Sequence, residues 1–568
     1  MIKLIKNNYI RRGGRLVRRL MESTITQLHI LKIPGLNGLL KRIAHGEEIN
    51  SDNVLPSLCQ ESKEDRVLIN FKLAEALFNM GNCKQATVFI QRAWIFSGLN
   101  EKYLPLFISI HAAIGDVEAI RAAHKSIGMR TANEHKTIET LKHFNSWQYA
   151  YANHNHDDEY HYDLEILNRI ALLARPHAFQ VKKSQPIKNR KVRLANLMFG
   201  MTHTNSVIVK NSLSFAQFHD QSKFEVTFFI PEQNAVILKW QEAIENIAKI
   251  KSLGYRVVTA PDSDSEEKSL IGLARLIYES DPDILITNAA LADLRHYFIT
   301  SLRPAPLIVG LCQGPPPQFI APDFNWSISW TKHPMIDCPT DCSLVNGGAV
   351  LPERQYSREE AKSFFGMPQE NLVVMSCGRP QKFQDLDFWN EIIKLLQSYP
   401  DVYYVVVGLV APPTWLQDAL TPDIIGRMKF FGWEKDFLKL LSMADVVVDT
   451  YPSGGGMTIV DAMSLGTPVV SFKNNYMKIF SQTDWSPAEE FMGITELLVE
   501  RGDFEQFRKL LSKLLANRDF RISMSELSRK RIISTSGSPE DMVRECEQVF
   551  LKVIEKHSGS SWNRKAHQ

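Results

Sequence analysis

The sequence predicts an α/β protein in which two Rossmann-like domains follow an α-helical, tetratricopeptide-like N-terminal domain. Two observations carry this prediction. Apolar residues have helical spacing from about residue 56 to 175, with few β-branched runs. Beyond a Pro- and Lys-rich linker, short apolar runs alternate with helical segments. The 568 residues are 44% hydrophobic and 23% charged, a globular composition that excludes disorder or a coiled coil for the whole chain.

The helical region contains one weak internal repeat. Gly81 and Gly115 are 34 residues apart, each within a set of small and apolar residues at helical spacing. This interval equals the tetratricopeptide period. A general helical bundle is the alternative, because two weak copies fall short of a solenoid. In either case we expect an interaction or packing module.

Ten apolar runs are expected to be strands of parallel sheets, because strands that alternate with helices pair in this way. They are Val192–Phe199, Phe224–Ile230, Tyr255–Thr259, Asp283–Thr287, Leu307–Leu311, Leu372–Ser376, Val402–Gly408, Lys429–Phe431, Ala444–Asp449 and Thr467–Phe472. A Pro-, Gly- and charge-rich stretch near Val345–Gly366 predicts the crossing between two Rossmann-like halves that face one another across a cleft. The expected boundaries are 1–175 for the helical domain, 176–190 for the linker, 191–355 and 356–545 for the two Rossmann-like domains, and 546–568 for a C-terminal tail.

Three consecutive glycines give the strongest local signal. Gly454, Gly455 and Gly456 follow a buried strand, and a helix begins near Met457. Glycines let backbone amides approach a phosphate, and the helix N-terminus adds about half a positive charge. A turn that needs glycine only for its geometry is the alternative. Three glycines exceed that need, so we predict a diphosphate site.

Two polar residues extend this predicted site along the helix. Thr458 is placed to donate a hydroxyl, and Asp461, one turn further, to accept from ribose hydroxyls. Arg379 and Lys382 follow the first strand of the second half. A cation at that position can neutralise a departing diphosphate. Surface solvation is the alternative for both, and position favours the diphosphate role more firmly for Lys382.

Candidate residues of the first half also lie after strands. His203 follows its first strand, so we expect an acid/base or substrate-orienting role in preference to a structural one. Gln313, Gly314 and Pro315 begin a rigid loop that leaves another strand at the same edge. That loop has no catalytic chemistry, and we expect it to shape the pocket.

Charge and cysteine usage exclude several classes of protein. Residues 1–46 carry ten basic residues and one acidic residue, whereas the remainder carries 56 basic and 62 acidic residues. The body is therefore not a nucleic-acid binder. The basic head is expected to be a solvated helix, with contact to an anionic membrane or a targeting role as the alternative. Seven scattered cysteines fit a reducing cytoplasm.

No metal site is expected from the ligand-type residues of the sequence. Cys338 and Cys342 have no second ligand pair at a suitable spacing. The cluster of His154, His156 and His161 with its neighbouring acids is interpreted as a polar loop. No stretch reaches the roughly 18 apolar residues of a membrane span.

Several of these segments together resemble the O-GlcNAc transferase and SPINDLY family, which also includes bacterial cytosolic protein N-glucosyltransferases. The similarity covers about residues 190–535. It rests on Asp283–Ile286, Leu302–Pro306, Gly314–Pro315, Ala444–Thr450, Asp461 and Leu465–Pro468. The helical head matches the family habit of placing tetratricopeptide repeats before a GT-B catalytic pair.

The resemblance implies roles for single residues. His203 corresponds to a family His at the sugar site, Lys382 to the Lys that holds the diphosphate, Thr458 to a phosphate donor and Asp461 to the ribose acceptor. One departure removes a donor contact. Where O-GlcNAc transferases have His-Thr before this Thr, the chain has Gly456 and Met457.

The expected enzyme is therefore a cytoplasmic glycosyltransferase of hexosyltransferase type. It would move a sugar from a nucleotide sugar, most plausibly a UDP-sugar, to Ser, Thr or Asn of a protein or peptide. Residues 191–355 would be the acceptor side, and 356–545 would bind the nucleotide sugar. No metal and no further cofactor is expected. One alternative is a transferase or sugar-nucleotide epimerase of surface polysaccharide synthesis, and another is a helical-repeat scaffold without catalysis.

Overall fold

The computed structural model describes residues 62–153, 163–184, 186–187, 189–199, 201, 207–312, 321–330, 340–413, 415–473 and 487–558. The chain divides into two compact units, residues 1–156 and 157–568. No helix in these described ranges is long and apolar enough to cross a membrane.

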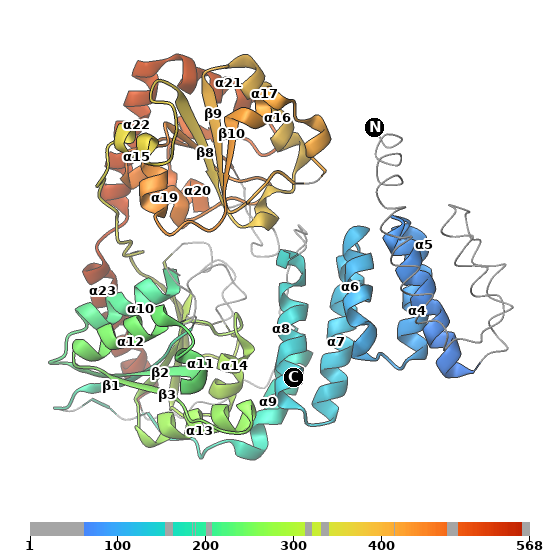
Figure 1. Ribbon diagram of the computed structural model, residues 1–568. Coiled ribbons are helices and arrows are strands. Elements are labelled where there is room, and N and C mark those ends of the chain that lie inside the picture. The colour runs from blue at the N-terminus through green and yellow to red at the C-terminus, as the bar shows by residue number, and fades with distance from the viewer. Residues whose placement is uncertain are drawn as a thin grey trace. The chain divides into compact units, whose positions relative to one another are not determined.

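The first unit is a series of antiparallel helical hairpins (Figure 1). Its helices are α4 (Lys63–Asn79), α5 (Cys83–Phe96), α6 (Leu104–Ala113), α7 (Val117–Asn133) and α8 (Thr137–Asn153). The predicted helical head is thus confirmed.

The two glycines of the predicted repeat occupy equivalent turns. Gly81 and Gly115 have φ values of +79° and +75°, which glycine adopts without strain. In each turn the next residue, Asn82 or Asp116, caps the following helix through its side chain. Repetition of this turn is consistent with a tetratricopeptide-like unit.

The first sheet of the second unit has seven parallel strands in the order β3-β2-β1-β4-β5-β6-β7. They are β1 (Val192–Leu197), β2 (Phe224–Gln233), β3 (Arg256–Ala260), β4 (Ile284–Thr287), β5 (Leu307–Cys312), β6 (Trp326–Ser329) and β7 (Cys342–Leu344). Helices of this part of the chain are α9 (Leu164–Ala174), α10 (Val207–Phe218), α11 (Asn234–Ile237), α12 (Gln241–Ser252), α13 (Glu266–Glu279) and α14 (Leu294–Ser301).

The second sheet repeats this pattern with six parallel strands in the order β10-β9-β8-β11-β12-β13. They are β8 (Leu372–Cys377), β9 (Val402–Val407), β10 (Met428–Phe431), β11 (Val446–Val448), β12 (Val469–Phe472) and β13 (Leu498–Val499). The helices are α15 (Arg358–Phe364), α16 (Leu386–Ser398), α17 (Pro422–Arg427), α18 (Phe437–Ser442), α19 (Met457–Ser464), α20 (Pro487–Met492), α21 (Phe504–Ala516) and α22 (Arg518–Thr535).

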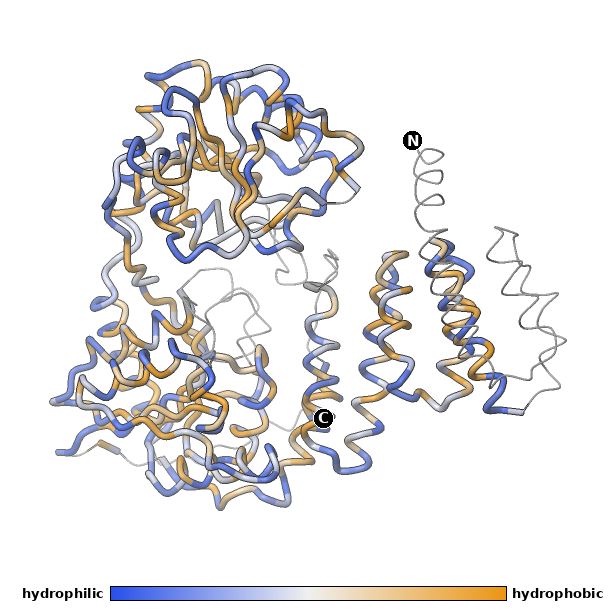
Figure 2. Tube along the Cα trace, viewed as in Figure 1, coloured by the Kyte–Doolittle hydropathy of each residue, from blue (hydrophilic) through white to orange (hydrophobic). Residues whose placement is uncertain are grey.

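The apolar runs of the sequence form the cores of both sheets. Hydrophobic residues concentrate on the strands, as Figure 2 shows, and the central strands are buried on both faces. All ten predicted strands are present. The structure adds β6 and β7, whose apolar residues are interrupted by serines, and the two-residue strand β13.

The C-terminal segment differs from the expected tail. Residues Pro539–His557 form α23, and the expected boundary at residue 546 falls inside this helix. One face of α23 is buried in the core of the first sheet, with Cys546, Phe550 and Val553 inaccessible to solvent. His219 and Glu547 join α10 to α23 through a contact of 2.9 Å between Nδ1 and Oε1. The last helix is therefore part of the first Rossmann-like domain, because its apolar face completes that core.

The other end of the predicted helical domain also differs. Helix α9 falls within the predicted 1–175 range but belongs to the second unit, where it packs against α14. Just after α9, the amide of Phe179 donates to the carbonyl of Leu302. The sequence could not separate α9 from the preceding helices, because all of them share helical spacing.

The burial of α23 can be tested by one pair of neighbouring substitutions. Phe550→Ala should destabilise the first sheet by about 3–5 kcal/mol, because it removes a fully buried ring. Leu551→Ala is the matched control, because this side chain is 41% exposed. Hydrogen–deuterium exchange measures both effects, with peptides of the second sheet as the internal reference. Equal protection of β1 in the two variants would contradict the assignment of α23 to this core.

Candidate functional site

The candidate site lies where the strand order of the second sheet reverses. Strands β8 and β11 are neighbours, yet the chain leaves them toward opposite sides of the sheet. In open α/β sheets, ligands bind beyond the carboxyl ends of the strands at this switch point. Lys382 follows β8 on a 3₁₀ turn, Pro380–Phe383, and the three glycines follow β11. The fold thus unites two sequence signals that are 72 positions apart.

Two hydrogen bonds stabilise the turn formed by Gly454–Gly456, here called the glycine turn. The Gly455 amide donates to Oδ1 of Asp449 at 2.7 Å, and the Thr450 hydroxyl donates to the carbonyl of Ser453 at 2.7 Å. A Cβ on Gly455 would lie 3.3 Å from Oδ1 of Asp449, so a larger residue would press on this carboxylate. The backbone of the turn is therefore fixed, which suits it to present amides to an anion.

Helix α19 begins directly after the turn without a side-chain cap. Its N-cap residue is Gly456, and Met457 is the first helical residue. Thr458 is half-buried in the first turn, with Oγ1 3.9 Å from the Cβ position that Gly455 lacks. The first amides of a helix carry partial positive charge, and a preceding glycine leaves them open to a ligand. The open amides of this helix start can bind an anionic ligand.

Lys382 points into the same turn. Its ammonium donates a hydrogen bond to the carbonyl of Gly454. Burial lowers the pKa of Lys382 to about 8, against the attraction of the Asp449 carboxylate, and nearby Arg379 also lowers it. Arg379 itself is exposed. Of the two predicted cations, the structure brings Lys382 into the turn.

Asp461 lies one turn into α19 and is half-buried. Burial raises its pKa to about 6, and Lys210 of α10 lowers it. Among the described residues none donates a hydrogen bond to this carboxylate. An unpaired acceptor beside the turn has the chemistry needed to bind a sugar hydroxyl.

Two features of the site were not predicted from the sequence. Asp449 is 5% exposed and ends the apolar run of β11, where its position at the carboxyl end of a strand was the available signal. Gly408, with φ of +107°, packs against the backbone of Gly378, and a Cβ there would lie 1.9 Å from the Gly378 carbonyl oxygen. This contact fixes the loop that leads from β8 to Lys382.

The predicted residues of the first half lie outside the described residues. They are His203, Gln313, Gly314 and Pro315. Within the described part, the switch point between β1 and β4 holds another histidine, His296, whose Nδ1 lies 2.8 Å from the Thr287 hydroxyl. Burial lowers the pKa of His296 to about 4, which favours the neutral ring at physiological pH.

A buried ion network supports the same edge of the first sheet. Arg295 of α14 bonds to both carboxylate oxygens of Asp293 and to Glu232 at the end of β2, at distances of 2.6–3.1 Å. It fixes α14 against β2 and was not predicted from the sequence.

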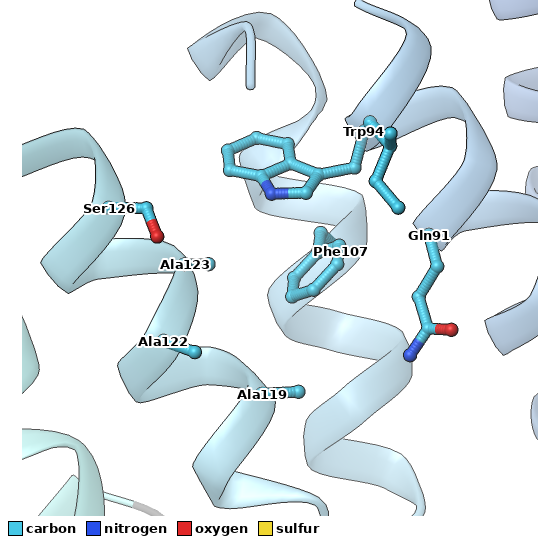
Figure 3. A pocket seen from close by; sticks show the side chains of 8 residues that line it. Gln91, Trp94, Phe107, Ala119, Ala122, Ala123 and Ser126 are labelled. Atoms are coloured by element: carbon cyan, nitrogen blue, oxygen red, sulfur yellow. The ribbon is translucent and has the colours of Figure 1, made fainter. Parts of the chain in front are cut away.

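Two further observations concern metals and cavities. No group of three metal-ligating side chains occurs in the described ranges, and the cluster His154–His161 lies outside them. A pocket of about 250 Å³ lies between α5, α6 and α7 of the helical unit (Figure 3). Its lining is Gln91, Trp94, Ile95, Phe107, Ala119, Ala122, Ala123 and Ser126. It has no titratable group, so it offers no reaction chemistry.

Comparison with known proteins identifies the class of the second sheet domain. Residues 371–517 match the family model of glycosyl transferases group 1. This segment contains Lys382, the glycine turn and Asp461, so the site described above lies within a glycosyltransferase domain. The predicted enzyme class is confirmed at this level.

Two curated relatives match in sequence. The lipopolysaccharide core biosynthesis glycosyltransferase LpsE of Rhizobium meliloti (strain 1021) is 26% identical over 168 residues, 29% of this chain and 46% of the relative. The UDP-N-acetylglucosamine–peptide N-acetylglucosaminyltransferase of Giardia intestinalis (strain ATCC 50803 / WB clone C6) is 25% identical over 187 residues, 30% of this chain and 13% of the relative. The chain thus spans less than half the length of either.

A solved structure covers more of the chain. A mutant of the Thermobaculum terrenum O-GlcNAc transferase aligns with 88% of this chain and 99% of its own, with a TM-score of 0.51 and 14% identity. This likeness shows the fold. The chain has a GT-B fold with a helical N-terminal region, which confirms the predicted fold class.

The raised pKa of Asp461 gives a prediction for stability against pH. Its folded-state pKa exceeds the unfolded value, so its stabilising contribution is present at low pH and lost as pH rises from about 4 through about 6. Asp461→Asn removes the buried charge. The variant should exceed the wild type in free energy of unfolding by about 1–3 kcal/mol at pH 8 and by nothing at pH 4.

Denaturant unfolding across this pH range measures the difference. Asp445→Asn is the control, because Asp445 is a buried carboxylate that is paired with Arg358 and Lys362. Loss of the Asp445 charge in this variant should destabilise the protein at neutral pH, because Arg358 and Lys362 lose their partner. A destabilised Asp461→Asn variant at pH 8 would contradict the unpaired carboxylate.

Proposed function

We propose that this chain is a glycosyltransferase that moves a sugar from a nucleoside diphosphate sugar, most plausibly a UDP-sugar, to a Ser, Thr or Asn side chain of a protein or peptide. One observation carries the proposal. The ammonium of Lys382 and the uncapped start of α19 converge on a single glycine turn inside a glycosyl transferases group 1 domain.

The geometry supports stabilisation of a leaving diphosphate. In sugar transfer the bond from C1 to the diphosphate oxygen breaks while an acceptor atom attacks C1, so negative charge grows on the phosphate. A fixed ammonium and fixed helix amides gain attraction as that charge grows. With a pKa of about 8, Lys382 is mostly protonated at neutral pH. These positive groups leave no step that requires a metal ion.

Asp461 is assigned to donor binding. Its unpaired carboxylate can accept hydrogen bonds from the ribose hydroxyls of the nucleotide. Such a contact is equally strong in the ground state and the transition state, so it contributes to affinity and little to turnover. His203 is proposed to act at the sugar, as a base or as an orienting group.

Two observations support a polypeptide acceptor. The helical hairpins precede the α/β domains, in an arrangement that the solved O-GlcNAc transferase shares over 88% of this chain. The second curated relative is by name a peptide glycosyltransferase. Stacked hairpins of this kind provide extended surfaces that suit polypeptides.

A second candidate is transfer to a surface polysaccharide or lipopolysaccharide core. It is favoured by the first curated relative, which by its name acts in lipopolysaccharide core biosynthesis. The donor site would be the same in both cases, and the acceptor would differ.

Incubation with a panel of radiolabelled nucleotide sugars tests the reaction and the acceptor. We expect transfer or slow hydrolysis with a UDP-sugar, and a melting temperature raised by UDP, because a ligand that binds only the folded state stabilises it. GDP is the competing nucleotide. Label in a protein fraction supports the first candidate, and label in polysaccharide supports the second. Absence of turnover, together with no shift by UDP or GDP at millimolar concentration, would exclude both.

Two substitutions separate the predicted roles of Lys382 and Asp461. Lys382→Ala should lower kcat by roughly 100-fold or more, because it deletes a positive charge that acts on the leaving group. Asp461→Ala should raise the donor KM with little change in kcat. Lys394→Ala is a control, since Lys394 lies on the exposed face of the neighbouring α16. Steady-state kinetics over donor concentration measures all three. Full activity of Lys382→Ala would remove the lysine from the mechanism.

A further inference from the structure

A buried carboxylate lies beneath the glycine turn. Asp449 follows β11, and both of its oxygens are used. Oδ1 accepts from the amides of Gly455 at 2.7 Å and Thr450 at 2.9 Å, and Oδ2 accepts from the Ser471 hydroxyl at 2.7 Å. Burial raises the pKa of Asp449, whereas these three donors and the attraction of Lys382 favour the ionised carboxylate. The carboxylate is thus held in place beneath the glycine turn.

The lysine approaches the same turn from the opposite strand. Lys382 bonds to the carbonyl of Gly454, and Asp449 bonds to the amide of the next residue, Gly455. The side-chain stem of Lys382 passes within 3.3 Å of the Cβ position that Gly378 lacks, beside the methyl group of Thr450. Lys382 and Asp449 therefore bond to the carbonyl and the amide of one peptide unit, the one that joins Gly454 to Gly455.

The charges that act on this pair are few. Lys382 interacts with the Asp449 carboxylate and is repelled by Arg379. Between the strands lies the Cys377 thiol, whose pKa is raised by burial and by Asp449 and Asp461. In the described part of the chain, Asp449 is the acidic group whose attraction acts on Lys382. It is therefore the counter-ion of the lysine among these residues.

We propose that Asp449 is a positioning residue for the proposed sugar transfer: its carboxylate fixes the glycine turn and keeps Lys382 as an ammonium ion until the diphosphate of the donor binds. This inference rests on the proposed function. Asp449 does not touch the donor. It acts through Lys382 and through the backbone of the glycine turn, which leads into the uncapped start of α19.

A comparison of Asp449 with Asp445, which flank β11, separates this role from burial alone. Asp445, at the amino end of the strand run, is also a buried carboxylate, at 4% exposure. It accepts from the Val373 amide and pairs with Arg358 and Lys362. Its partners lie at the opposite end of the sheet, so its charge supports the fold without reaching the glycine turn.

The test compares Asp449→Asn with Asp445→Asn in the full chain. The reactivity of Lys382 toward acetic anhydride, followed by mass spectrometry across pH, reports its pKa without any nucleotide. Asp449→Asn should lower that pKa by about 1–3 units, because the attraction of the Asp449 carboxylate is lost. Asp445→Asn should leave it unchanged. An unchanged pKa in Asp449→Asn, or an equal fall in both variants, would overturn the proposal.

Calorimetry of UDP binding supplies a second measurement. Near neutral pH the wild type binds with little proton uptake, because Lys382 is already charged. In Asp449→Asn the lysine must gain its proton as the phosphate arrives, so uptake should approach one proton per UDP. Asp445→Asn is the control here as well, and it should behave as the wild type. UDP binding without added uptake in Asp449→Asn would also overturn the proposal.

A double variant covers a failure of Asp449→Asn to fold. Asp449→Asn with Lys382→Met carries neither charge, so it should recover a cooperative unfolding transition that the single variant lacks. A double variant that stays unfolded would overturn the pairing. Failure of the proposed function has a different signature, namely a shifted Lys382 pKa in a protein that binds no nucleotide and transfers no sugar.

Discussion

Parallel pairing of β8 with β11 is the constraint on which the candidate site depends. These strands are far apart in the chain, and their pairing sets two carboxyl ends side by side while the connections leave toward opposite faces. The lysine of one loop and the glycines of the other meet there. Contacts from neighbouring strands and loops stabilise this arrangement. Gly408 lets its loop pack against Gly378, and Ser471 from β12 braces Asp449.

The fold was predictable where buried strands appear in the sequence as continuous apolar runs. Central parallel strands such as Val402–Val407 are covered on both faces, so nearly every residue is apolar. Strands β6 and β7 escape notice because serines interrupt their apolar residues, and β13 escapes because it is only two residues long. Helix α23 escapes for another reason. Its apolar face is visible in the sequence, but the sheet that covers this face lies more than two hundred residues earlier.

The site was predictable where geometry demands a particular residue type. Three glycines between a strand and a helix indicate phosphate chemistry, and a lysine after a strand indicates a cation at the sheet edge. Asp449 could not be assigned by the same means. An aspartate that ends a strand is ordinarily a cap or a turn residue, and its role depends on which donors the distant loops bring to it. His203 and the loop from Gln313 lie outside the described residues, so their roles stay predictions.

The return of α23 to the first sheet has a consequence for synthesis of the protein. The second sheet domain is inserted, in topological terms, between β7 and the helix that finishes the core of the first. During translation the first sheet is synthesised early. Its apolar face then stays uncovered while about two hundred further residues are synthesised. The inserted domain can fold as a unit in that interval. Chaperones that act at the ribosome should therefore bind mainly to the first sheet. A chain that ends before Phe550 should fail to complete the core of this sheet, although the sheet is synthesised first.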